Sequence, residues 1–197
     1  LHTSRRDAFR AVNDTPIATV DFNTKKIEFI KKQHSKTGKG KKLKLKGKLE
    51  EKVALLKVFP NFAPEQIKFF EKNKYKGLVI EGTGLGQAPV GVPNKLCKEN
   101  AKVMKAVQSL IKSGCVVVMS SQCIFGTVQM HVYSNAVDLV DAGVIPGKDM
   151  LAETAFIKLS WLLGNFKKNE VKELMSKNLR GEINPCVSMD SFPPKGL

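Results

Sequence analysis

Residues 77–89 read Gly-Leu-Val-Ile-Glu-Gly-Thr-Gly-Leu-Gly-Gln-Ala-Pro, a short apolar run that stops abruptly in three spaced glycines. The apolar run at 78–81 predicts a buried strand. In an open α/β sheet, ligands bind beyond the carboxyl ends of the strands, where glycine lets the backbone approach them closely. We therefore expect the loop from Gly82 to Gln87 to lie at a functional site. Because this glycine spacing occurs in many unrelated proteins, its meaning depends on the rest of the chain.

The sequence around this loop alternates between strand and helix patterns. The expected elements are strands at 53–59, 78–81 and 115–120 and helices at 64–72, 94–114, 150–163 and 167–178, with Asn94 as the cap of the second helix. Continuous apolar strands joined by helical crossovers are typical of a parallel sheet with helices on both faces. The predicted fold class is thus α/β, with a three-layer domain built on a parallel sheet of three to four strands.

A different pattern precedes this domain. Residues 16–22 and 26–30 are rich in β-branched and aromatic residues and predict a hairpin. A single hairpin cannot form a core of its own, so we expect it to pack on other sequence. The predicted organisation is a hairpin segment at 1–30, a lysine-rich linker at 31–52 and an α/β domain at 53–197 that ends in an irregular tail.

The linker carries much of the positive charge. The chain has 197 residues and a net charge of +15, and residues 25–52 hold 12 lysines against three glutamates. Lysines separated by glycines predict a flexible, self-repelling connector. Two interpretations stay open: electrostatic attraction to phosphates, or a solvated linker without a ligand.

The composition also excludes several classes of protein. No window approaches 18 uninterrupted apolar residues, so no transmembrane helix and no membrane partner are expected. The four cysteines form no Cys-x-x-Cys pair, and together with the three histidines they do not match the spacing of a zinc site. We therefore expect that the chain binds no metal and that its thiols are reduced, as in a cytoplasmic protein. The sequence has no Gly-x-Ser-x-Gly elbow, which argues against a serine hydrolase. The glycine loop does not lead directly into a helix, which argues against a dinucleotide site.

Three strand ends are expected to converge at one edge of the sheet, at residues 59–61, 82–87 and 120–123. They bring backbone N–H groups, hydroxyls and side-chain amides together. The polar side chains are those of Thr83, Gln87, Ser120, Ser121 and Gln122. This surface suits a small polar ligand or a neighbouring active site, and Glu81 is the one carboxylate beside it.

These segments resemble a known family. Residues 77–89, Met119-Ser-Ser-Gln-Cys-Ile-Phe-Gly126 and the stretch 142–164 are similar to the C-terminal half of L-asparaginase-type amidohydrolases. The opening Leu1-His-Thr-Ser-Arg-Arg-Asp-Ala-Phe-Arg-Ala-Val-Asn13, together with 122–133 and 178–183, is most similar to the D-subunit family of archaeal glutamyl-tRNA(Gln) amidotransferases. The resemblance implies that 1–30 ends an N-terminal asparaginase-like domain and that 53–197 is the C-terminal one.

The resemblance also implies an activity and partners. Such subunits release ammonia from glutamine or asparagine with a threonine nucleophile, assisted by a second threonine, an aspartate and a lysine. The ammonia passes to the E subunit of the amidotransferase, which uses ATP and Mg²⁺ to convert Glu-tRNA(Gln) to Gln-tRNA(Gln). The D subunits pair as homodimers, and no cofactor is expected on this chain.

The resemblance places the catalytic residues elsewhere. Both threonines, the aspartate and the lysine would lie upstream of Leu1, so we expect no catalytic residue in this chain and no activity from it alone. Gln87, on the loop with Gly84 and Gly86, matches a position that binds substrate across the dimer. The alternatives are a stand-alone type I L-asparaginase and a non-catalytic α/β module that binds a small ligand.

Overall fold

The computed structural model of the chain describes residues 4, 8, 10–31, 42 and 44–191, and it contains two sheets. The residues group into two compact units. The larger unit is Lys46–Ile183, and the smaller one combines Leu1–Leu45 with Asn184–Leu197. Among the described residues, no helix is long and apolar enough to cross a membrane.

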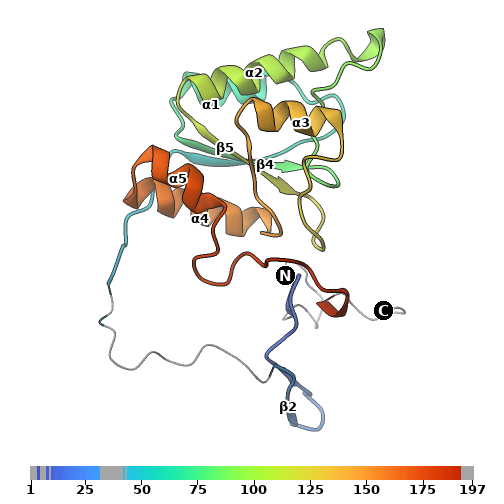
Figure 1. The fold of residues 1–197 in the computed structure, drawn as a ribbon, viewed down its shortest axis with the longest axis vertical. Helices are drawn as coiled ribbons and strands as arrows, with labels where there is room; N and C mark the ends of the chain where they lie inside the picture. The colour runs from blue at the N-terminus through green and yellow to red at the C-terminus, as the bar shows by residue number, and fades with distance from the viewer. Residues whose placement is uncertain (1–3, 5–7, 9, 32–41, 43, 192–197) are drawn as a thin grey trace. The chain divides into compact units, whose positions relative to one another are not determined.

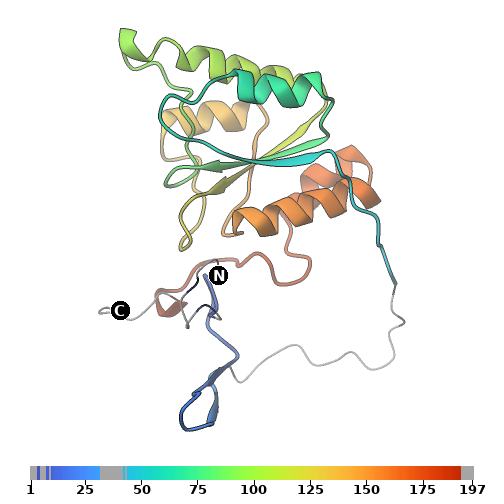
Figure 2. The same cartoon turned by 180° about the vertical axis from the view of Figure 1, so that it is seen from behind.

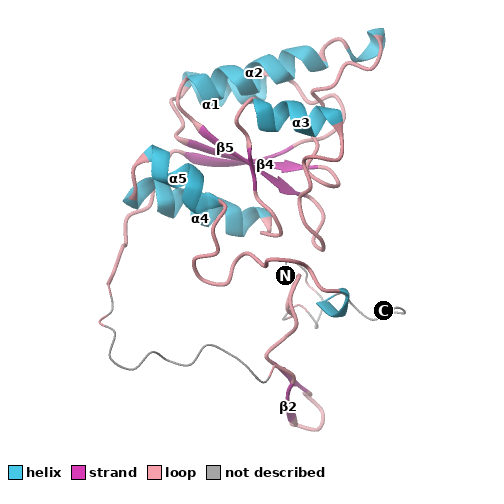
Figure 3. Ribbon diagram, in the orientation of Figure 1, coloured by secondary structure: helices cyan, strands magenta, loops and turns pink. Residues whose placement is uncertain are grey.

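The larger unit is built on a four-stranded parallel sheet (Figures 1 and 3). Its strands follow one another in space in the order in which they occur in the sequence. They are β3 (Val53–Lys57), β4 (Gly77–Gly82), β5 (Val116–Ser121) and β6 (Ile145–Pro146). At the centre of the sheet, Val79 of β4 pairs with Leu55 on one side and with Val118 on the other. The predicted α/β fold with a parallel sheet of three to four strands is confirmed.

Helices cover both faces of this sheet, which gives the three predicted layers (Figures 1 and 2). Successive side chains of a strand point to opposite faces. On one face lie α1 (Glu65–Lys72), α2 (Asn100–Lys112) and α3 (Ser134–Asp141). On the other lie α4 (Ala152–Asn165) and α5 (Lys168–Met175).

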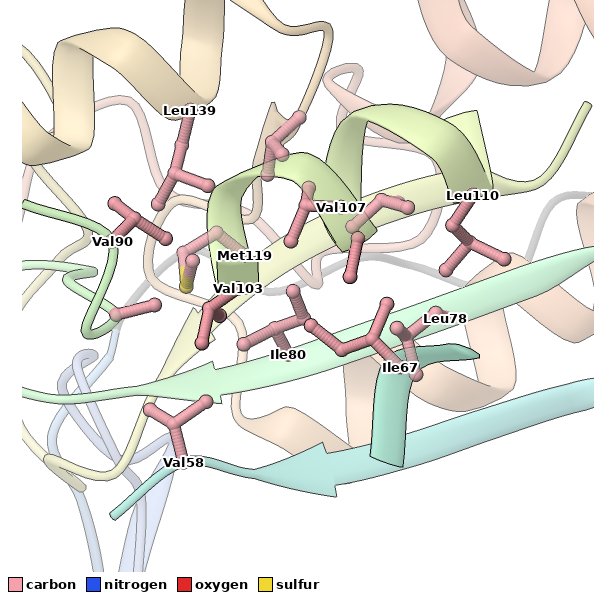
Figure 4. Packing of buried hydrophobic residues seen from close by; sticks show 14 of the residues in the cluster. Val58, Ile67, Leu78, Ile80, Val90, Val103, Val107, Leu110, Met119 and Leu139 are labelled. Carbon is pink, nitrogen blue, oxygen red and sulfur yellow. The ribbon is translucent and has the colours of Figure 1, made fainter. Parts of the chain in front are cut away.

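Each face has its own apolar core. On the α1–α3 side, Ile67, Val103 and Leu110 pack against Leu78 and Ile80 of the central strand (Figure 4). On the opposite side, the alternate β4 residue Val79 packs with Leu159 and Leu162 of α4 and with Val171 and Met175 of α5. The continuous apolar strands are explained by this double burial, because both faces of the sheet are covered.

The smaller unit contains the predicted hairpin. Strands β1 (Ala18–Val20) and β2 (Ile27–Phe29) pair antiparallel, and Val20 lies opposite Ile27. Its apolar side chains are largely exposed, with 70% of Val20 and 71% of Phe29 accessible. Asn184 donates a hydrogen bond to the carbonyl of Asn13 at 3.1 Å, and the short 3₁₀ turn η2 (Met189–Ser191) follows. The central part of the expected linker, residues 32–41 and 43, lies outside the described residues.

One local expectation is wrong, and two elements were missed. Asn94 caps the 3₁₀ turn η1 (Lys95–Cys97), accepting from the Leu96 N–H at 2.9 Å, and α2 starts only at Asn100. The elements α3 and β6 were not predicted at all. The predicted domain boundaries stay a prediction.

Candidate functional site

The three strand ends meet at the carboxyl edge of the sheet, as expected. The Val58 N–H donates to the carbonyl of Glu81 at 3.1 Å, which joins the end of β3 to β4. The Gln122 N–H donates to the carbonyl of Gly82 at 2.8 Å, which joins the end of β5 to the glycine loop. Backbone hydrogen bonds therefore continue past the strands and hold all three loops together.

The glycine loop is a tight turn closed on itself. Thr83 and Gln87 exchange two backbone hydrogen bonds of 2.9 Å, and the Gly86 N–H donates to the Thr83 carbonyl at 3.0 Å. Gly84 and Gly86 have φ values of 50° and 99°, in the left-handed region that glycine adopts without strain. A Cβ on Gly86 would lie 2.7 Å from Cγ1 of Val128, so this position also has no room for a side chain.

The side chain of Gln87 lies close to Gly84. Its Oε1 lies 3.0 Å from the place that a Cβ on Gly84 would occupy. Its Nε2 is buried and has no hydrogen-bond partner among the described residues. An amide N–H buried without an acceptor costs about 1–3 kcal/mol, which favours a conformation or a complex in which it finds one. The role predicted for Gln87 across a dimer stays a prediction.

Most other polar side chains at this edge hold the loops in place. The Ser121 hydroxyl donates to the Gly84 carbonyl at 2.6 Å and accepts from the Cys123 N–H at 3.0 Å. Gln122 donates through Nε2 to the carbonyls of Val58 and Glu81, at 2.7 and 3.0 Å. Ser120 is fully buried and donates to the Met150 carbonyl at 3.0 Å. The expectation that these three side chains face a ligand is therefore wrong for Ser120 and Gln122, whose hydrogen bonds are used within the fold.

A hollow of about 130 Å³ opens beside the turn. It is lined by Gly84, Leu85, Ser121, Cys123, Phe125, Gly126, Thr127, Val128, Lys148, Asp149, Met150 and Leu151. Lys148 has a left-handed backbone with a φ of 57°, and the preceding Gly147 donates to the Met119 carbonyl at 2.7 Å. The sequence reasoning missed this second turn, although the Pro146-Gly147 pair is a turn signal that would have located it.

The chemistry of this edge is that of a binding surface. It offers backbone donors and one unpaired amide, and the nearby carboxylate of Glu81 is paired with Lys57 at 3.4 Å. Within the described part of the chain, no three histidine, cysteine, aspartate or glutamate side chains group as metal ligands. His131 is exposed on the loop before α3.

Comparison with known families bears on this arrangement. Residues 52–175 match the family model of the glutaminase/asparaginase C-terminal domain. The chain belongs to this family. The match spans β3 to α5, which is nearly the whole of the larger unit, and so includes both the glycine loop and the helices that cover the sheet.

Two curated proteins, each named as the D subunit of glutamyl-tRNA(Gln) amidotransferase, are similar over almost all of the chain. The one from Methanococcus maripaludis is 45% identical over 96% of this chain, and the one from Pyrococcus abyssi is 43% identical over 98%. The chain covers 43% and 41% of those proteins, so it spans about two fifths of the length of these relatives.

Solved asparaginases share the fold of this family member. The thermostable L-asparaginase from Thermococcus kodakarensis superposes with a TM-score of 0.72 at 27% identity, over 89% of this chain and 49% of that one. L-asparaginase I from Vibrio cholerae superposes with a TM-score of 0.71 at 25% identity, over 87% of this chain and 48% of that one. The resemblance inferred from the sequence motifs is confirmed.

Proposed function

We propose that this chain belongs to the ammonia-releasing, glutaminase/asparaginase-type subunit of a glutamyl-tRNA(Gln) amidotransferase. The observation that carries the proposal is the 45% identity to the D subunit from Methanococcus maripaludis over 96% of the chain. The two asparaginase structures match the fold at 27% and 25% identity, which supports the asparaginase alternative less specifically.

In this proposal the chain binds and positions the amide substrate, and the nucleophile comes from outside residues 1–197. The resemblance puts both threonines, the aspartate and the lysine there. A threonine hydroxyl is a weak nucleophile that needs an adjacent base. The released ammonia would pass in the cytoplasm to the E subunit, which would supply ATP and Mg²⁺ and hold Glu-tRNA(Gln).

Gln87 is the residue through which this chain would act. We propose that the D subunits pair as homodimers and that the loop of Gly84, Gly86 and Gln87 completes the neighbour's amide site. A primary amide does not titrate, so its role is to position the charged end of the substrate by hydrogen bonds. The unpartnered Nε2 supports this role, because a movement of the side chain that exposes it would let a substrate carboxylate supply the missing acceptor.

The proposal can be tested with a chimera. The chain replaces the matching C-terminal part of the D subunit from Methanococcus maripaludis, and ammonia release from glutamine and from asparagine is measured by a coupled assay. The 197-residue chain alone should release none, while the chimera should be active and should respond to the E subunit loaded with Glu-tRNA(Gln). Turnover by the chain alone would reject the assignment of the nucleophile.

The same assay separates the alternatives. A stand-alone type I L-asparaginase would hydrolyse asparagine at a rate that the E subunit and Glu-tRNA(Gln) leave unchanged. A non-catalytic ligand-binding module would give a folded but inactive chimera. Either result would reject the amidotransferase proposal.

A further inference from the structure

The larger unit has a second hollow at the amino ends of its strands, on the opposite edge of the sheet from the glycine loop. It has a volume of about 590 Å³. It is lined by Glu50, Glu71, Lys74, Tyr75, Lys76, Ser113, Gly114, Leu163, Phe166 and Lys168. Lys76 directly precedes β4, and Gly114 comes just before β5, so the hollow is formed where these strands begin.

Five lysines surround this hollow, which we call the lysine pocket. Lys74, Lys76 and Lys168 line it directly. The Lys46 ammonium lies 3.7 Å from the centre of the Phe166 ring, and the Lys52 ammonium lies 5.9 Å from that of Tyr75. In the part of the chain that the structure describes, none of the five forms an ion pair, whereas Lys57, Lys68, Lys102, Lys158 and Lys177 each do.

Two of these lysines stand where the local backbone disfavours lysine. Lys74 follows the end of α1 with a φ of 57°, a left-handed position that glycine usually occupies and that costs other residues about 1–2 kcal/mol. Lys168 is the first residue of α5, where the helix dipole favours acidic side chains instead. The local backbone therefore favours lysine at neither position, although Lys25 and Lys148 have the same left-handed conformation elsewhere in the chain.

We propose that the lysine pocket binds a nucleotide segment of a nucleic-acid strand, with the backbone phosphates on the lysines. The two glutamates on its wall, Glu50 and Glu71, favour a ligand that carries amino groups as well as negative charge, which a nucleotide does and a simple polyanion does not. Glu50 accepts from the Lys52 N–H at 3.0 Å and Glu71 accepts from the Ser109 hydroxyl at 2.7 Å, each through one carboxylate oxygen. The second oxygen of each is a fitting acceptor for the amino group of cytosine or adenine.

The proposed pocket is separate from the ammonia-releasing site. The strands run from the lysine pocket to the glycine loop, so the two lie at opposite ends of the sheet. A substitution in the lysine pocket can therefore abolish nucleic-acid binding without affecting ammonia release, and a substitution in the glycine loop can do the reverse.

The test is RNA binding by the 197-residue chain, measured by fluorescence anisotropy over a salt series. The probe is a fluorescein-labelled RNA of about 20 nucleotides and mixed sequence, longer than the ~4–16 nucleotides that one small domain covers. The variant replaces Lys74, Lys76 and Lys168 with alanine. Its matched control replaces Lys95, Lys98 and Lys105, three exposed lysines near the other end of α2, and so loses the same charge.

The pocket variant should bind RNA at least about tenfold more weakly at ~0.1 M salt, and its log–log salt slope should fall by about 2, since each phosphate contact on a single strand contributes about 0.7. The control should stay close to the parent chain. An equal loss in both variants, or RNA binding displaced as well by polyphosphate as by unlabelled RNA, would overturn the proposal.

A second variant separates binding from folding. Lys74→Gly removes one charge but relieves the left-handed backbone, so it should raise the thermal midpoint while it weakens RNA binding about fivefold at ~0.1 M salt. RNA affinity equal to that of the parent chain in this more stable variant would also overturn the proposal.

Discussion

The ion pair between Lys158 and Glu182 should make a large, pH-dependent contribution to stability. The two side chains meet at 2.7 Å and are only 5% and 14% exposed. Glu182 also accepts hydrogen bonds from the N–H groups of Leu179 and Arg180, at 3.0 and 2.6 Å. Burial raises the pKa of Glu182, but the hydrogen bonds from Lys158 and from the backbone outweigh it and lower the pKa to about 2.

The magnitude follows from this pKa. The ordinary value is 4.5, and each unit of difference between the folded and unfolded states corresponds to about 1.4 kcal/mol. Glu182 thus stabilises the fold by about 3 kcal/mol at pH 7. Because the folded pKa is the lower one, this contribution is complete above pH 4.5 and is lost as the pH falls toward 2. At pH ~3 about 1.4 kcal/mol of it should remain.

Urea unfolding of Glu182→Gln at pH ~7 and pH ~3 tests this reasoning. Trp161, the single tryptophan of the chain, lies beside the pair on α4 and reports unfolding by its fluorescence. The difference in unfolding free energy between parent and variant should shrink from about 3 kcal/mol to about half of that. Glu173→Gln, which removes an exposed ion pair with Lys177, is the control and should have little effect. A difference that is the same at both pH values would refute the argument.

Three further predictions concern the turn and the thiols. In the active chimera, Gln87→Ala should raise KM about tenfold, the effect of one or two hydrogen bonds, and lower kcat less; an unchanged KM would remove Gln87 from the site. Gly84→Val and Gly126→Val should both lower the thermal midpoint, since both glycines have positive φ. Only Gly84→Val should alter KM, because only Gly84 lies against Gln87. Burial raises the pKa of the Cys115 thiol to about 12. A thiol reagent at pH ~8 should therefore modify exposed Cys123 readily and Cys115 only in urea. Equal rates of modification of the two thiols in the native chain would contradict this.

The sheet could be predicted because its strands are unambiguous. The runs around Val79 and Val117 are apolar at every position, and only a strand covered on both faces requires that. The edge strand β6 has two residues, one of them a proline, and such a segment carries no periodic signal. Helix α3 was missed because it is short and has no capping side chain at its start.

The start of α2 shows a different limit. Asn94 has the sequence of a helix cap and does cap a turn, but that turn lasts for three residues only. Leu96 within it is 93% exposed, so no apolar contact extends the turn into the helix. Capping is a local property that the sequence reveals. The length of the helix depends here on tertiary packing, which the sequence alone does not reveal.

The meeting of the three strand ends was predicted correctly, but the hydrogen bonds of the side chains there were less predictable. Convergence of the strand ends follows from the parallel topology and needs no side-chain detail. Which polar groups remain available depends on distances across the fold, such as that from Gln122 to the carbonyl of Val58, 64 positions earlier. Lys158 of α4 pairs with Glu182, which lies beyond the end of α5, where no helical spacing could indicate it.

The sequential order of the strands has a consequence for synthesis of the protein on the ribosome. Strands β3, β4 and β5 and the helices α1 to α3 emerge first, so one face of the sheet is covered while the chain is still growing. The helices for the other face, α4 and α5, are made last, and until then Val79, Val116 and Val118 have nothing to pack against. Such a half-covered sheet is the kind of intermediate that aggregates, and the nascent chain is therefore most in need of a chaperone after β5 has emerged and before α4 has done so.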